Sequence, residues 1–145
     1  MRGTQGLLLA AVLAAACSSG NGNTDPEAIS VGGSYQTAVT LVSNTCPGQT
    51  VQQHSTAVNH TPGATTLSLT HAGSTYNGTL AADGTFITST VTQVFDGISF
   101  QLSITGEFSE TAMDALVTVL AGRQPPCNFT ARWAGPKNGD PNVLP

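Results

Sequence analysis

The sequence predicts an all-β domain: a small antiparallel up-and-down barrel of about eight strands, with a two-sheet sandwich as the alternative. Apolar and polar residues alternate over short runs, as they do in strands that bury one face. Asp-Gly and similar turn pairs separate these runs, which is typical of hairpins. The composition agrees, because charged residues are only 8% of the chain and Thr, Gly and Asn, which favour strands and tight turns, supply much of the rest.

The first half of the domain contains four runs that predict strands. In the earliest run, Tyr35, Val39 and Leu41 share one parity, so one face of that strand is apolar. The second run is polar and gives the weakest signal. The third and fourth runs alternate cleanly on both sides of Ala72-Gly73 and therefore predict a hairpin. These strands are expected at residues 34–43, 51–60, 65–71 and 74–80.

Four more runs complete the domain. The second of them gives the clearest strand signal in the chain, because apolar and polar residues alternate from Ile98 to Phe108. The third also suits a helix, but its β-branched segment Val117-Thr118-Val119 favours a strand. These strands are expected at residues 85–95, 98–108, 111–121 and 127–134. Eight strands in meander order close naturally into a barrel, which removes the exposed sheet edges.

The N-terminal segment has the pattern of an export signal. Leu7 to Ala16 is a continuous apolar run that follows the basic residue Arg2. As a helix this run spans about 15 Å, roughly half of a bilayer core, so it fits a signal peptide better than a membrane span. The chain is expected to divide into a signal peptide (1–16), a tether (17–30), the barrel (31–135) and a disordered tail (136–145).

The apolar run ends in Leu13-Ala14-Ala15-Ala16-Cys17. This pattern resembles the lipobox of bacterial lipoproteins, in which small residues precede a cysteine that receives diacylglycerol and becomes the new N-terminus. The resemblance implies that Cys17 is lipidated and holds the chain on a membrane, facing the periplasm or the exterior. Ser18, in place of Asp, implies the outer membrane where the cell has one. The polar residues 18–27 bury too little surface to offset their ordering entropy and are expected to form a flexible tether.

Cys46 and Cys127, the two cysteines of the domain, are predicted to form a disulfide, as exported domains commonly do. The bond closes a loop of about 80 residues and contributes roughly 4–5 kcal/mol in the chain-entropy model. Two free thiols or part of a metal site are the alternatives. The metal site is disfavoured because no pair of histidines lies near these cysteines in the sequence.

Gly33-Ser34-Tyr35 resembles the Gly-x-Trp motif of lipocalins, with Tyr in the place of Trp. Arg132 lies on the last strand, where an Arg packs across that ring in the calycin superfamily. The resemblance implies a barrel that carries a small apolar ligand, with Tyr35, Phe100, Arg132 and Trp133 around it. An eight-stranded barrel is also small enough to be filled by its own side chains. The residues available to fill it, which is the favoured outcome, are Tyr35, Phe86, Phe100, Phe108, Phe129 and Trp133.

Several other classes of function are disfavoured. The net charge is −4 and the four basic residues do not cluster, which argues against nucleic acid and against anionic lipid surfaces. His54, His60 and His71 are spaced too widely on straight strands to bind one metal ion, so we expect surface histidines and no metal. The acidic residues considered for catalysis are predicted to be solvated, with Glu107 on the polar side of its strand and Glu110 and Asp114 beside a turn.

The leading hypothesis from the sequence is a non-enzymatic lipoprotein of the cell envelope that needs no cofactor. It acts either as an interaction module that contacts a protein or glycan through its surface, or as a carrier of a small apolar ligand. The carrier predicts a cavity near Tyr35, Phe100 and Trp133, whereas the interaction module predicts a filled barrel and an exposed apolar patch. A hydrolytic enzyme of unknown type is the third hypothesis.

Overall fold

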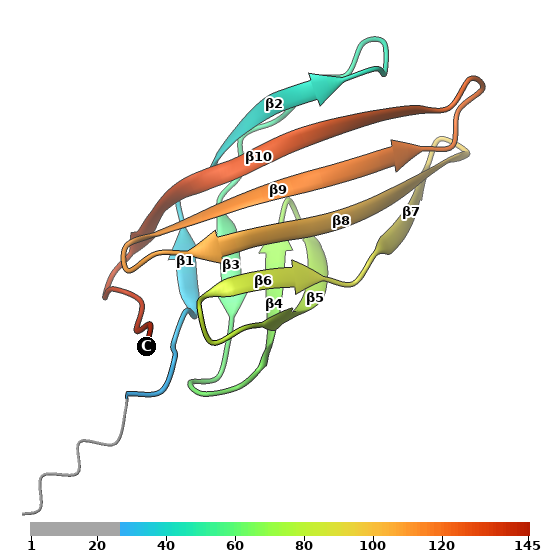
Figure 1. Cartoon of the computed structure of the whole chain (residues 1–145). Helices are drawn as coiled ribbons and strands as arrows, with labels where there is room; N and C mark the ends of the chain where they lie inside the picture. Colours follow the sequence, from blue (N-terminus) through green and yellow to red (C-terminus); the bar gives the residue numbers. More distant parts are fainter. Residues whose placement is uncertain (1–26) are drawn as a thin grey trace, which may run out of the picture.

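The computed structural model describes residues 27–145, which form a closed antiparallel β-barrel with two additional strands (Figure 1). These residues contain no helix, and so none that is long and apolar enough to cross a bilayer. The strands are β1 (Gly33–Tyr35), β2 (Ala38–Asn44), β3 (Thr56–Asn59), β4 (Thr66–His71), β5 (Ser74–Leu80), β6 (Thr85–Thr88), β7 (Val91–Phe95), β8 (Ile98–Phe108), β9 (Ala112–Ala121) and β10 (Cys127–Asn138).

Eight strands close the barrel in the order β1-β3-β4-β5-β6-β8-β9-β10. Antiparallel pairing of β10 with β1 completes the ring. Neighbours in the ring follow one another in chain order, and every neighbouring pair is antiparallel. The predicted up-and-down barrel is therefore confirmed, and the alternative two-sheet sandwich is wrong.

Two of the predicted strands are each divided in two by a bend. The run expected at residues 34–43 bends at Gln36 and Thr37 and becomes β1 and β2, which both pair with β10. Gly135 of β10 permits this bend, because a Cβ atom at residue 135 would collide with the carbonyl oxygen of Gln36. The run expected at residues 85–95 becomes β6 and β7, which both pair with β8.

The sheet extends beyond the barrel because its strands differ in length. β8, β9 and β10 have 11, 10 and 12 residues, whereas β3, β4 and β5 have 4, 6 and 7. The ends of the long strands continue as a five-stranded sheet, β2-β10-β9-β8-β7, which we call the overhang. The overhang projects from the end of the barrel opposite to the end where the described chain begins (Figure 1).

The C-terminal segment is ordered, so the predicted disordered tail at residues 136–145 is wrong. Strand β10 continues to Asn138, and Ser30 forms an antiparallel bridge with Val143. Asn142 is buried, and its Oδ1 atom lies 2.7 Å from the Tyr35 hydroxyl. Backbone pairing and this buried polar contact order a segment whose Pro, Gly and Asn content is typical of a disordered terminus.

The weakest predicted strand forms only in part. Of residues 51–60, only β3 is a strand, and residues 51–55 belong to the loop that connects β2 to β3. Within this loop the Gln53 side chain takes the place of a backbone partner: its Oε1 accepts from Val39 N–H at 2.8 Å, and its Nε2 donates to Val39 C=O at 2.7 Å.

The barrel interior is filled by side chains from every strand of the ring. Tyr35, Leu69, Ile104 and Met113 are among the fully buried residues. The six aromatic residues predicted to fill the barrel divide into two groups. Four are buried, namely Tyr35, Phe86, Phe108 and Trp133, whereas Phe100 and Phe129 are only partly buried. The prediction of a filled core is therefore confirmed for the barrel, and the remaining two rings lie on the overhang.

Candidate functional site

Tyr35 is fully buried. Its single hydroxyl proton is shared between two acceptors, the Val31 carbonyl oxygen and Asn142 Oδ1, each 2.7 Å from the hydroxyl oxygen. Burial raises the pKa of the Tyr35 hydroxyl to about 12, partly offset by the hydrogen bond with Asn142. The ring packs against Phe108 with 5.6 Å between centroids. Tyr35 thus ties the N-terminal and C-terminal segments to the core.

Arg132 faces away from the interior, so the predicted packing of its guanidinium on the Tyr35 ring is wrong. Trp133 points inward, and neighbouring residues of a strand point to opposite faces. Arg132 instead donates two hydrogen bonds to the carboxylate of Asp114 on the adjacent strand β9. These hydrogen bonds and the ion pair lower the pKa of Asp114 and raise that of Arg132. The pair is exposed and contributes little to stability.

Trp133 and His71 form the centre of a buried cluster at the base of the overhang. Their rings stack with centroids 3.7 Å apart and planes 13° from parallel. The centroid of the Tyr76 ring lies 6.1 Å from that of the indole, and the centroid of the His54 ring lies 5.6 Å from that of His71. Both His71 and Trp133 are 6% exposed. We call His54, His71, Thr37, Thr56 and Trp133 the histidine cluster.

A directional chain of hydrogen bonds links the polar members of the histidine cluster. Thr37 donates its hydroxyl proton to the His54 carbonyl oxygen at 2.8 Å, so it accepts from Thr56 Oγ1 at 2.9 Å. The Thr56 proton is then committed, and its oxygen accepts from His71 Nδ1 at 2.9 Å. The chain therefore places the proton of neutral His71 on Nδ1. Burial, and to a lesser degree the charge of His54, lowers the pKa of His71 to about 4.

The prediction that all three histidines lie on the surface is wrong for His71. Hairpin pairing and the β2–β3 loop bring His54 beside His71, although the residues are far apart along the chain. His60 lies elsewhere: it accepts from Val31 N–H and contacts the Ala64 carbonyl oxygen at 2.9 Å. Among residues 27–145 no group of three or more His, Cys, Asp or Glu side chains is arranged to hold a metal ion.

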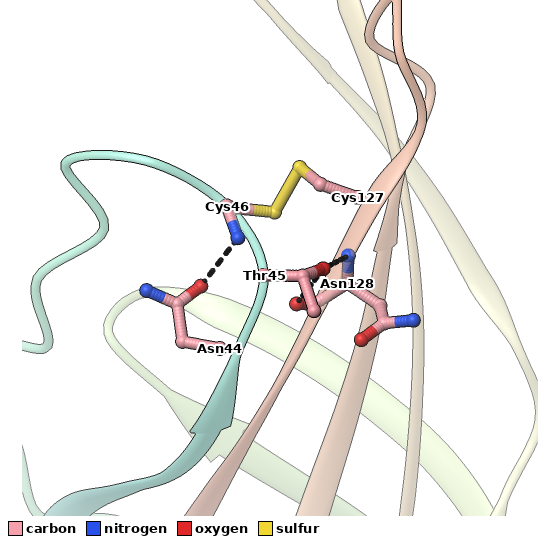
Figure 2. The surroundings of a disulfide bond; sticks show 5 residues. All are labelled: Asn44, Thr45, Cys46, Cys127 and Asn128. Atoms are coloured by element: carbon pink, nitrogen blue, oxygen red, sulfur yellow. Dashed lines mark hydrogen bonds between the residues drawn. A yellow bond between two sulfur atoms is a disulfide. The ribbon is translucent and has the colours of Figure 1, made fainter.

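The predicted disulfide between Cys46 and Cys127 is confirmed, with a Cα–Cα distance of 5.1 Å (Figure 2). The bond joins the loop after β2 to the first residue of β10. Beside it, the Thr45 hydroxyl accepts from Asn128 N–H at 2.9 Å and lies 3.0 Å from Asn128 C=O, to which it donates (Figure 2). Thr45 N–H donates to the same carbonyl oxygen at 2.8 Å. Cys46 N–H donates to Asn44 Oδ1 at 2.7 Å. The remaining cysteine, Cys17, lies outside the described residues.

The overhang carries most of the exposed large apolar side chains among the described residues. Val94 and Phe95 at the end of β7 are 71% and 69% exposed. Phe100, on the inner face of the overhang, is partly buried, and Gln93 beside it donates to Ser74 Oγ at 3.1 Å. The other exposed residues on strands of the overhang are Leu41, Val42, Leu116 and Leu120, and Ile87 lies on β6.

A surface depression of about 380 Å³ lies on the outside of β3, β4 and β5. Asn59, Ser68 and Asn77 line it, and these residues point outward because Val58, Leu69 and Tyr76 between them point inward. The lining is uncharged and includes no aromatic ring. It is therefore not the apolar ligand cavity that a carrier requires.

The chain matches no protein-family model, and no curated protein or solved structure is significantly similar to it. Of the four residues suggested for ligand binding, the structure brings Tyr35 and Trp133 into one core, leaves Phe100 under the overhang and places Arg132 outside. The sequence interpretation missed the histidine cluster. Alternation along β4 could have predicted the burial of His71, because this residue follows Leu67 and Leu69 at the same two-residue spacing and points to the same inner face.

Mild acid is expected to destabilise the fold through His71. Its pKa is about 4 in the folded protein against an ordinary value of 6.5, so the unfolded chain binds the proton first as pH falls. The contribution of neutral His71 to the free energy of unfolding is therefore fully present well above pH 6.5. It is lost as the pH falls from 6.5 to about 4, by at most about 1.4 kcal/mol per pH unit. Urea unfolding at pH 7.5, 6.0 and 5.0 measures this loss.

The control is His71→Gln, which keeps a polar group near Thr56 but does not titrate. It is expected to abolish most of the fall in stability between pH 7.5 and 5.0, whatever its effect at pH 7.5. Asp83 and Asp114 also have lowered pKa values, but they start from 3.8 and act below this window. An undiminished pH dependence in His71→Gln would show that other groups are responsible.

Proposed function

We propose that this chain is a lipoprotein of the bacterial cell envelope, anchored by Cys17, and that its barrel is a non-enzymatic interaction module. The overhang is the contact surface, and an envelope protein or glycan is the partner. The lipobox pattern that ends at Cys17 supports the anchor, and the confirmed disulfide suits an exported domain. The outer membrane is the favoured location where the cell has one.

One observation carries the choice of an interaction module over a carrier. The barrel is filled by its own side chains, whereas large apolar side chains such as Leu120 and Phe95 are exposed on the overhang. Exposed apolar surface is costly in water and commonly marks an interaction site. The small apolar ligand remains a second candidate, supported by the partly buried Phe100, Leu102 and Phe129 on the inner face of the overhang.

The position of the chain ends agrees with this use of the overhang. The described chain begins at the end of the barrel opposite to the overhang (Figure 1). An anchor at Cys17, joined through residues 18–26, would hold that end toward the membrane. The overhang would then face away from the bilayer, where an envelope partner can reach it.

The test is photo-crosslinking in the exporting host, with a photoreactive amino acid in place of Leu120 on the outer face of the overhang. The matched control replaces Thr70, which is exposed on the outer face of β4. Residue 120 is expected to give an adduct of defined mass in the membrane fraction, and residue 70 is not. Cys17→Ser is expected to move the protein to the soluble fraction.

The two halves of the proposal fail separately. Equal labelling from residues 120 and 70, or none from either, would argue against the overhang as contact surface. Retention of the Cys17→Ser protein in the membrane fraction would argue against the lipid anchor. A small apolar molecule as the adduct at residue 120 would favour the carrier.

A further inference from the structure

The overhang reintroduces the two sheet edges that a closed barrel lacks. Unpaired backbone groups on an edge strand are a template for pairing with another chain, so proteins usually protect such edges. Here the edges are β2 and β7, on opposite sides of the overhang (Figure 1). They differ in how they are protected.

The β2 edge is protected in three ways. The Gln53 amide hydrogen-bonds both backbone groups of Val39, which occupies part of the edge. The register of β2 against β10 shifts between Thr130 and Ala131, and such a bulge disrupts pairing with further strands. The disulfide of Cys46 fixes the loop that follows β2.

The β7 edge has none of these protections. β7 pairs with β8 in an unbroken register, and no other strand among residues 27–145 pairs with it. Its sequence, Val91-Thr92-Gln93-Val94-Phe95, has no charge and no proline. Val94 and Phe95 are the two most exposed large apolar residues of the described chain. An edge of this kind favours strand pairing strongly.

We propose that β7 pairs antiparallel with β7 of a second copy of this chain, about a twofold axis at Gln93. In this register Thr92 of each copy lies opposite Val94 of the other, and Gln93 lies opposite Gln93. Val91 lies opposite Phe95, so each exposed Phe95 ring gains an apolar cross-strand neighbour. The overhangs of the two copies become one continuous sheet.

Charge does not oppose a second copy in this orientation. Asp96, which follows β7, is the only charged residue from Thr85 to Gly106. In the antiparallel register the two Asp96 carboxylates lie at opposite ends of the paired strands, roughly 20 Å apart at about 3.4 Å per residue. That separation exceeds the Debye length of about 10 Å at 0.1 M salt. The paired edges therefore bring no like charges close together. A twofold pair also closes without leaving a further β7 edge open.

Site-directed disulfide crosslinking of the full chain in its host tests the pairing. Gln93→Cys is expected to shift under mild oxidation to a species of twice the mass on a non-reducing gel, because residues opposite each other at the axis meet disulfide geometry. The unaltered chain controls for its own cysteines. Thr70→Cys, on the outer face of β4, controls for random collision.

A second experiment tests the register. Thr92→Cys and Val94→Cys are each expected to give little dimer alone, and a mixed dimer when both are expressed together with different tags. Val94→Lys combined with Gln93→Cys is expected to lose the dimer, because a lysine on an edge strand opposes pairing. Far-UV circular dichroism verifies that this variant still folds.

Three outcomes would overturn the proposal. One is a Gln93→Cys dimer no more abundant than that of Thr70→Cys. Another is a dimer that survives Val94→Lys in a folded protein. The third is an adduct of Gln93→Cys with a different protein, which would assign the β7 edge to another partner. None of these outcomes depends on Cys17 or on the contact at Leu120, so the dimer and the proposed function are tested independently.

Discussion

Replacement of both Cys46 and Cys127 by alanine is expected to lower the free energy of unfolding by about 4.5 kcal/mol. The bond joins residues 81 apart in sequence, and in the chain-entropy model a closed loop of this length restricts the unfolded chain strongly. Small domains have total stabilities of about 5–15 kcal/mol, so this loss is a large fraction. Urea unfolding of the oxidised protein and of the double variant measures it.

Two controls separate the loop-closure effect from local packing. A reductant is expected to bring the wild-type protein close to the double variant and to leave the double variant unchanged. Thr45→Val removes only the hydroxyl hydrogen bonds beside the disulfide and is expected to cost about 0.5–1.5 kcal/mol for each. A double variant no less stable than Thr45→Val would contradict the loop-closure account.

The barrel could be predicted because alternation is a property of each strand alone. Turn pairs such as Asp96-Gly97 divide the chain into runs, and the run lengths leave little choice but a meander. The overhang could not be predicted in this way. It depends on the point at which the chain stops pairing with one neighbouring strand and continues to pair with another. Strand β6 pairs with both β5 and β8, whereas β7 pairs with β8 alone. That choice is made by the pairing of distant segments.

The wrong predictions for Arg132 and His71 have a common cause. In both cases the alternation of inward and outward residues along the strand was not followed. Alternation places Phe129, Ala131 and Trp133 inward and thus Arg132 outward, which conflicts with the residue role implied by the lipocalin resemblance. His71 follows the inward parity of Leu67 and Leu69, but its polarity suggested the surface. Its burial requires the hydrogen-bond chain through Thr56, and the partners in that chain come from other segments.

Trp133→Ala is expected to lower the free energy of unfolding by about 3–5 kcal/mol. The indole is 6% exposed, stacks on His71 and contacts Tyr76, so its removal opens a cavity at the base of the overhang. Leu116→Ala is the matched control, since Leu116 lies on the outer face of the adjacent strand and is exposed. It is expected to cost less than about 1 kcal/mol. Because Trp133 is the only tryptophan, circular dichroism should follow the unfolding.

The same variant is expected to weaken the pH dependence of stability. The pKa of His71 is low mainly because the ring is buried, and Trp133 covers one face of that ring. Loss of the indole admits water, so the folded-state pKa moves back toward 6.5 and less stability is lost between pH 6.5 and 4. A Trp133→Ala protein that is destabilised but keeps the full pH dependence would show that the indole does not control the hydration of His71.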